Sequence, residues 1–113
     1  MAISYEDTKN YLALKEYFSA KLRSIGTSGL RLYLISEKKL PNGALFSIKH
    51  GPTPKSFGER ITVKVDYLEN GARVTVRSRY IFPLQNILDF GKNKSNVAAV
   101  FRYLDADIKN IPQ

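Results

Sequence analysis

The stretch ERITVKVDYLENGARVTVRSRYI, residues 59–81, carries the strongest structural pattern in the chain. Apolar and polar side chains alternate on both sides of Asn70 and Gly71, as expected for two half-buried β-strands. Asn-Gly is the dipeptide most typical of a two-residue hairpin turn. We therefore expect an antiparallel hairpin whose turn at Asn70-Gly71 fixes the strand register.

The predicted register gives the hairpin one apolar face and one basic face. Counting outward from the turn, Val65 faces Val76 on the apolar side, which is expected to pack against helices. On the other side Lys64 faces Arg77, although like charges placed opposite each other destabilise a strand pair. The basic residues predicted to share this second face are Arg60, Lys64, Arg77 and Arg79.

Residues 29–36 and 41–50 alternate in the same way and predict two more strands. Extending the alternation to them adds Arg31, Tyr33 and Lys49 to the basic face. Arginines and aromatic rings on a sheet can hold phosphates and stack bases, so the face is a candidate nucleic-acid interface. The plainer interpretation is that long basic side chains only protect the sheet edges and keep the protein in solution.

Two amphipathic segments predict a helix at each end of the chain. The first is expected to run from an N-cap at Ser4 to a stop at Gly26. Its apolar stripe consists of Leu14, Phe18, Leu22 and Ile25. The second helix is predicted in residues 96–112, and its stripe consists of Val97, Val100, Phe101, Leu104 and Ile108.

The predicted order of elements is helix, four strands, helix. Strands that follow one another through short connections form an antiparallel meander. We therefore predict an α+β fold, a single domain over residues 1–113 with an N-terminal helix, a four-stranded antiparallel meander sheet and a C-terminal helix, both helices on one face of the sheet. The opposite face, which carries the basic side chains, would be open to water.

The composition favours a globular protein with an anionic partner. Hydrophobic residues make up 43% of the chain, which is typical of a folded domain. There are 18 Lys and Arg against 10 Asp and Glu, and the net charge of +8 suits a nucleic acid, an acidic protein or an anionic membrane surface as partner. The sequence shows neither an apolar run long enough to span a membrane nor a signal peptide, so a cytoplasmic location is expected.

Few residues suit catalysis or metal binding. Cysteine is absent, which excludes disulfides and thiolate metal sites. The only histidine, His50, stands at the end of a predicted strand with no pair of carboxylates near it in the sequence. A lone histidine without a nucleophile or an orienting group is a poor catalytic base. We expect a binding module rather than an enzyme, with no catalytic residue, metal or cofactor.

The stretch DFGKNKSN, residues 89–96, shares letters with kinase and P-loop motifs but not their spacing. A P-loop would need a glycine five residues before the Gly-Lys pair, where Asn86 stands, and a protein kinase needs a far longer chain. We expect a helix entrance in which Gly91 takes a positive φ and Asn93 or Ser95 caps the first turn. Asp89 would then accept hydrogen bonds from the loop amides.

Lys92 and Lys94 are unusual residues at the start of a helix. The N-terminal end of a helix dipole is positive and prefers anions to cations. The two lysines are either simply solvated or join the helix amides in holding an anion such as sulfate or phosphate. They are therefore added to the candidate anion-binding residues.

The segment from Val76 to Leu104 resembles the C-terminal segment of a group of uncharacterised bacterial proteins. In those proteins a strand ending in Ser-Arg leads to an Asp-x-Gly-x-Asn turn and then a helix. The matching residues here are Ser78, Arg79, Asp89, Gly91 and Asn93. The resemblance covers about a quarter of the chain and brings no function with it.

The order helix, meander, helix is also similar to TATA-binding-protein-like and helix-grip folds. Most such domains have a strand before the first helix, and only the residues MAIS are available for it here. The helix-grip resemblance implies an alternative function, a pocket for a small apolar ligand between the sheet and the C-terminal helix. Its predicted lining consists of Tyr67, Tyr80, Phe82 and Phe101. A further alternative is an adaptor or an oligomer subunit that pairs with another chain.

Overall fold

The computed structural model describes residues 4–51, 58–80 and 91–110 of the 113-residue chain. Its strands are β1 Ser4–Leu12, β2 Leu32–Leu40, β3 Gly43–His50, β4 Glu59–Leu68 and β5 Gly71–Tyr80. Its helices are α1 Lys15–Arg23 and α2 Lys92–Asp105, with short 3-10 helices η1 Ile25–Thr27 and η3 Ile108–Asn110. The strands pair antiparallel in the order β1-β5-β4-β3-β2, so the predicted α+β class and antiparallel sheet are confirmed.

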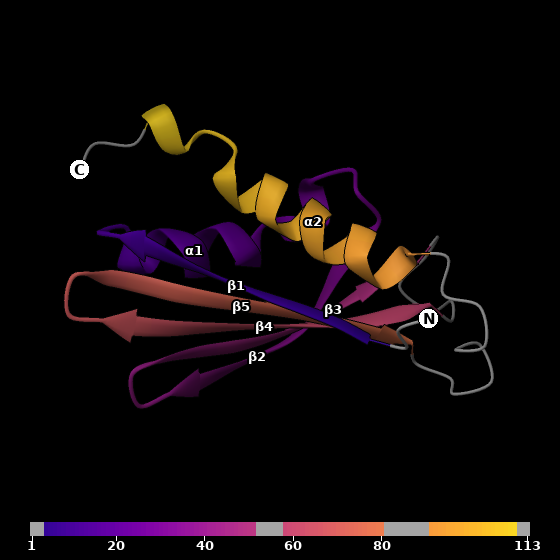
Figure 1. The fold of residues 1–113 in the computed structure, drawn as a ribbon, viewed down its shortest axis with the longest axis horizontal. Helices are drawn as coiled ribbons and strands as arrows, with labels where there is room; N and C mark the ends of the chain where they lie inside the picture. Colours follow the sequence, from indigo (N-terminus) through magenta and orange to yellow (C-terminus); the bar gives the residue numbers. More distant parts are fainter. Residues whose placement is uncertain (1–3, 52–57, 81–90, 111–113) are drawn as a thin grey trace.

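Both helices lie on the same side of the sheet (Figure 1). Phe18 of α1 and Val100 of α2 are fully buried in one core with Val63 and Val76 of the central strands. The apolar residues alternate along β4 and β5, so one side of the hairpin faces the helices, as the pattern predicts. The other side of the sheet is called the open face below.

The N-terminal segment is a strand, so the prediction of a helix from Ser4 to Gly26 is wrong in its first half. Residues 4–12 pair with β5 along their whole length and give the sheet five strands instead of four. The capping pattern at Ser4 is a local preference, and pairing with a distant strand outweighs it. Positive φ angles at Ala13 and Leu14 turn the chain from β1 into α1.

The apolar stripe predicted for the first helix is largely confirmed. Phe18, Leu22 and Ile25 are fully buried, and Leu14 is partly buried against them. The α-helix itself ends at Arg23, and the next turn is the 3-10 helix η1.

The hairpin turn lies one residue earlier than predicted, at Glu69 and Asn70, with Leu68 facing Gly71. Gly71 has no positive φ and therefore does not serve the turn. It is a residue of β5, and a Cβ there would collide with the carbonyl oxygen of Tyr11 on β1. The register differs from the prediction by two residues, so every side chain keeps its predicted face but changes its partner.

The helix α2 begins at Lys92, earlier than predicted. Gly91 precedes it with a φ of 74°, which confirms the predicted positive φ. The predicted side-chain cap is wrong, because Asn93 is buried and the backbone N–H of Ser95 donates to the Gly91 carbonyl at 2.9 Å. Asp89, predicted to accept hydrogen bonds from the loop amides, lies outside the described residues.

Candidate anion-binding interface

Basic side chains occupy adjacent positions on three neighbouring strands of the open face. Arg60 on β4 faces Arg79 on β5, and Lys49 on β3 faces Arg60 from the other side. Arg77 lies two residues from Arg79 and faces Thr62. Because neighbouring strands lie about 4.8 Å apart, these cations form one surface.

The predicted opposition of Lys64 and Arg77 is wrong, because the two-residue shift places Thr75 opposite Lys64. A like-charge pair is nevertheless present in the sheet, now between Arg60 and Arg79. The sheet therefore contains a like-charge pair, as the sequence predicts, but it lies at the end of the hairpin that is far from the turn.

The strand β5 carries a row of basic residues that sequence reasoning recognised only in part. Arg73 lies on the open face with Arg77 and Arg79, because the three residues are separated by even numbers of positions. The six-residue interval from Arg73 to Arg79 corresponds to about 20 Å of strand. Arg73 was missing from the predicted face, although continuing the alternation along β5 includes it. Its Nε donates to Asn10 Oδ1 at 3.0 Å.

Among the exposed basic residues of this face that the structure describes, Lys64 is the one with an ion pair, although Glu6 of β1 faces Arg77 and Asp66 of β4 faces Arg73 in the register. Lys64 Nζ lies 3.6 Å from the Asp66 carboxylate, two residues along the same strand. Arg77 and Arg79 are exposed, and neither forms an ion pair within the described residues. Arg60 Nη1 donates to a serine at 3.2 Å, while its Nε is buried without a hydrogen-bond partner in the described part of the chain.

A shallow hollow of about 200 Å³ lies among these side chains. Its lining combines cations, short hydroxyl side chains and one carboxylate. The lining residues are Glu6, Leu45, Thr62, Lys64, Thr75, Arg77 and Arg79. The surface is thus a positively charged depression rather than a row of isolated side chains.

Other predicted interface residues are divided between the open face and the covered side. Tyr33 and Lys49 lie in the same row of the sheet as the paired arginines, with Tyr33 partly buried and Lys49 only 6% exposed. Arg31 precedes β2 with a φ of 58°, so the strand alternation does not extend to it. Lys92 and Lys94 belong to α2, which covers the opposite side of the sheet.

A second group of polar side chains is buried where α2 meets the ends of β3, β4 and β5. Glu59 is only 2% exposed, and it receives hydrogen bonds from Asn96 Nδ2 at 2.7 Å and from His50 Nδ1 at 2.9 Å. Ser78 Oγ donates to Asn93 Oδ1 at 2.8 Å and accepts from Asn96 at 3.2 Å. We call the set Glu59, His50, Asn96, Ser78, Asn93 and Lys92 the Glu59 network; the side chain of His50 is only partly buried and that of Lys92 is 53% exposed.

The Glu59 network explains the lysine at the start of α2. Lys92 Nζ lies 3.7 Å from Glu59 Oε2, so a carboxylate of the protein itself supplies the anion expected at this helix end. Burial favours a higher pKa for Glu59, but hydrogen bonds from His50 and Asn96 and the charge of Lys92 outweigh it and hold the pKa below its ordinary value. Glu59 is therefore ionised near neutral pH.

His50 has a carboxylate partner that its sequence neighbourhood does not reveal. Glu59 is nine positions away, but the two residues face each other across β3 and β4. A carboxylate can only accept, so the His50 Nδ1 carries the hydrogen of this bond. Within the described residues, no three His, Asp or Glu side chains lie close enough together to hold a metal ion.

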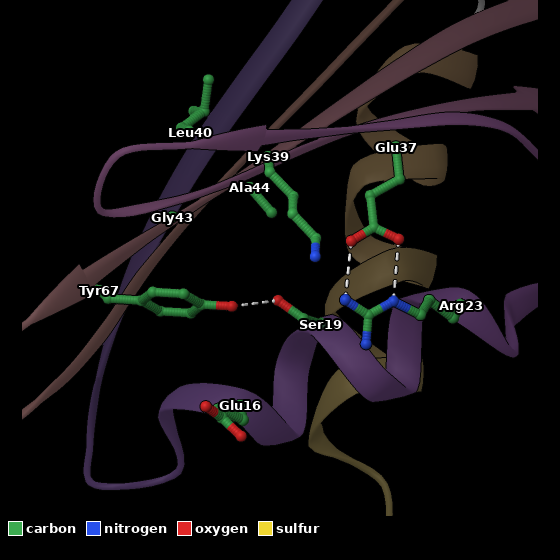
Figure 2. A pocket seen from close by; sticks show the side chains of 9 residues that line it. All are labelled: Glu16, Ser19, Arg23, Glu37, Lys39, Leu40, Gly43, Ala44 and Tyr67. Carbon is green, nitrogen blue, oxygen red and sulfur yellow. Dashed lines mark hydrogen bonds and ion pairs between the residues drawn. The ribbon is translucent and has the colours of Figure 1, made fainter.

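A polar cleft separates α1 from the β2–β3 hairpin, as Figure 2 shows. Its volume is about 320 Å³. Its lining residues are Glu16, Ser19, Arg23, Glu37, Lys39, Leu40, Gly43, Ala44 and Tyr67. Sequence reasoning missed this cleft, because its residues come from four separate elements, α1, β2, β3 and β4, and share no motif.

Two of the four residues predicted to line an apolar pocket, Tyr67 and Phe101, have described side chains, and both contact the core. Tyr67 lines the polar cleft, and its hydroxyl group is hydrogen-bonded to Ser19. Phe101 is 4% exposed in the core, and Lys9 Nζ lies 4.9 Å from the centre of its ring. Phe82 and the side chain of Tyr80 lie outside what the structure describes.

No family model, curated protein or solved structure matches this chain. Within the described residues, no helix is both long enough and apolar enough to cross a membrane.

Proposed function

We propose that the protein is a binding module that holds a nucleic acid on the open face of its sheet. The observation that carries this proposal is the row of Arg73, Arg77 and Arg79 on β5, beside Arg60 on β4. Guanidinium groups bind phosphates through paired, charge-assisted hydrogen bonds. A surface of several arginines therefore suits a polymer that presents phosphates at regular intervals.

The energetics of the arginine pair support a role in binding. Opposite charges at facing strand positions contribute roughly 0.2–1 kcal/mol, and like charges are unfavourable. Arg60 and Arg79 face each other, although a threonine or glutamate at either position would remove the repulsion. A bound polyanion would offset this repulsion, so the arrangement is favourable in the complex rather than in the free protein.

The side chains of the open face favour backbone contacts over base stacking. Tyr33 is the only aromatic residue on this face within the described strands, and it is partly buried. Proteins that bind single strands usually hold the bases against exposed aromatic rings. We therefore expect duplexes to bind at least as tightly as single strands, with little preference for sequence.

The order of the elements is in keeping with a TATA-binding-protein-like or helix-grip architecture. Such domains mostly have a strand before the first helix, and β1, Ser4–Leu12, is a strand in that place. Pairing of β1 with β5 puts the arginine row inside the sheet instead of at its edge. We infer that this placement gives the proposed interface its rigidity.

The proposal is tested by measuring the binding of labelled duplexes and single strands at several salt concentrations. The wild-type protein is expected to show a linear fall of log affinity with log salt. The double variant Arg77→Ala/Arg79→Ala should flatten this slope by about two units, one for each lost phosphate contact. No salt-dependent binding at low ionic strength would overturn the proposal.

A matched control separates this surface from the net charge of the protein. Arg102→Ala/Lys109→Ala removes the same two charges from exposed positions of α2 and η3. This variant should keep nearly the wild-type slope. Equal losses in both double variants would show that only the total charge matters. Equally tight binding of polyglutamate would instead favour an acidic protein as the partner.

A further inference from the structure

Two polar links hold α1 to the sheet on either side of the polar cleft (Figure 2). Ser19 Oγ lies 2.7 Å from the hydroxyl oxygen of Tyr67 on β4. Arg23 Nε and Nη2 donate to the two carboxylate oxygens of Glu37 on β2 at 2.8 and 2.7 Å. The cleft lies between the helix and the hairpin, next to these two links.

The inner surface of the cleft is made of small residues. Gly43 and Ala44 begin β3 there, and neither has a side chain that could fill the space. The resulting volume of about 320 Å³ is near the lower end of the roughly 300–1,000 Å³ typical of small-molecule sites. A small metabolite fits this volume, whereas a polymer does not.

The cleft is lined by two cations, Arg23 and Lys39, and two carboxylates, Glu16 and Glu37, so its formal charges balance. Lys39 directs its amine into the space between the two links, as Figure 2 shows, and it has no ion pair within the described residues. The hydrogen bonds from Arg23 hold the pKa of Glu37 below its ordinary value, and the charge of Lys39 adds to this effect. Glu37 is thus occupied by Arg23, and Glu16 is an exposed residue of the cleft.

We propose that the polar cleft binds a small organic anion whose carboxylate or phosphate oxygens accept hydrogen bonds from Lys39 Nζ and Arg23 Nη1. Arg23 uses only Nε and Nη2 on Glu37, so Nη1 is available to a ligand. The hydroxyl groups of Ser19 and Tyr67 offer polar partners for the rest of the molecule. This site uses none of the residues of the open face and does not depend on nucleic-acid binding.

The proposal is tested with the ¹⁵N-labelled full chain by NMR titration with succinate, glycerol phosphate and neutral glycerol. Succinate or glycerol phosphate should shift the amide signals of α1 and of residues 37–44, and glycerol should not. A tighter Kd for one of the two anions identifies the preferred headgroup. Because a charge-assisted hydrogen bond is lost, Lys39→Met should weaken binding by about tenfold or more.

Lys38→Met is the matched control, because it removes the same charge from the adjacent exposed residue. Lys38 faces Leu45 in the register and belongs to the open face, away from the cleft. The Lys38→Met variant should bind the anions with the same affinity as the wild-type protein. Equal weakening in both variants, or no shift at millimolar concentrations of either anion, would overturn the proposal. Circular dichroism of both variants checks that the fold is intact.

Discussion

The Glu59 network and the open face both contain charged groups, but they differ in how far these groups are buried and paired. Glu59 is buried, and each of its oxygens has a partner, with Lys92 providing the opposite charge. Arg77 and Arg79 are exposed and form no ion pair within the described residues, although Glu6 faces Arg77 across the strands. A buried charge without a partner costs several kcal/mol, whereas an exposed charge is solvated. Stability therefore accounts for the residues of the network, but it does not account for the arginines of the face.

The largest expected effect is that of removing the carboxylate of Glu59. Glu59→Ala leaves the amide of Asn96 and the ring of His50 without their acceptor and removes the partner of Lys92. Because Lys92 is 53% exposed, the loss comes mainly from the two donors left without an acceptor, and we expect about 1–3 kcal/mol in the free energy of unfolding for each of them. Urea denaturation followed by circular dichroism measures it.

Glu37→Ala is the control for this prediction, since it removes a carboxylate whose arginine partner is exposed. The side chain of Arg23 is 49% exposed and that of Glu37 21% exposed. Surface pairs contribute about 0–1 kcal/mol, so this variant should stay close to the wild type. Similar losses in the two variants would show that burial does not determine how much these two carboxylates contribute to stability.

The stability of the protein should fall in acid as Glu59 becomes protonated. The folded-state pKa of Glu59 lies below its ordinary value, so its contribution is complete above about pH 4.3 and is lost as the pH falls through the folded value. The difference in unfolding free energy between wild type and Glu59→Gln should therefore shrink below about pH 4. A difference that stays constant down to pH 2 would contradict the assigned charge.

A smaller effect is expected from the hydroxyl group of Ser78. Ser78→Ala removes the donor to Asn93 in a fully buried position, and we expect a loss of about 1–3 kcal/mol. Thr8→Ala removes a hydroxyl from the exposed pair with Thr75 and should change stability by less than about 0.5 kcal/mol. Thermal unfolding of both variants measures the contrast. Equal changes would mean that burial does not set the strength of these bonds.

The smallest expected effect on stability has the opposite sign. Arg79→Glu replaces the like-charge pair with Arg60 by an opposite-charge pair, and we expect a gain of roughly 0.2–1 kcal/mol. The same substitution should abolish most of the binding to nucleic acid, because it places a negative charge in the arginine row. A variant that loses stability, or that binds as well as the wild type, would remove the argument that the arginines serve binding.

The sequence predicted the faces of the central hairpin better than its pairing. Side-chain alternation has a period of two, and the observed shift of two residues leaves the faces of Val65 and Lys64 unchanged. The turn could not be placed correctly, because the role of Gly71 depends on the approach of Tyr11 from β1. The Asn-Gly signal is local, whereas the requirement for a glycine is set by a strand far away in the sequence.

The same limitation applies to β1 and to the buried network. Residues 4–12 contain an acceptable helix start, and only the presence of β5 makes them a strand. Glu59 and His50 lie on separate predicted strands, so their contact requires the register of β3 and β4. Ser78 and Asn93 are hydrogen-bonded only because α2 packs against β5, which their positions in the sequence do not reveal.

The pairing of β1 with β5 has a consequence for how the chain folds. Contacts such as Thr8 with Thr75 join residues that are 67 positions apart. Closing so long a loop is entropically costly, and proteins rich in such contacts fold slowly. The hairpin of β4 and β5 can form early, with its arginine row on an unprotected edge. We therefore expect the open face to reach its final, paired form only in the last step of folding.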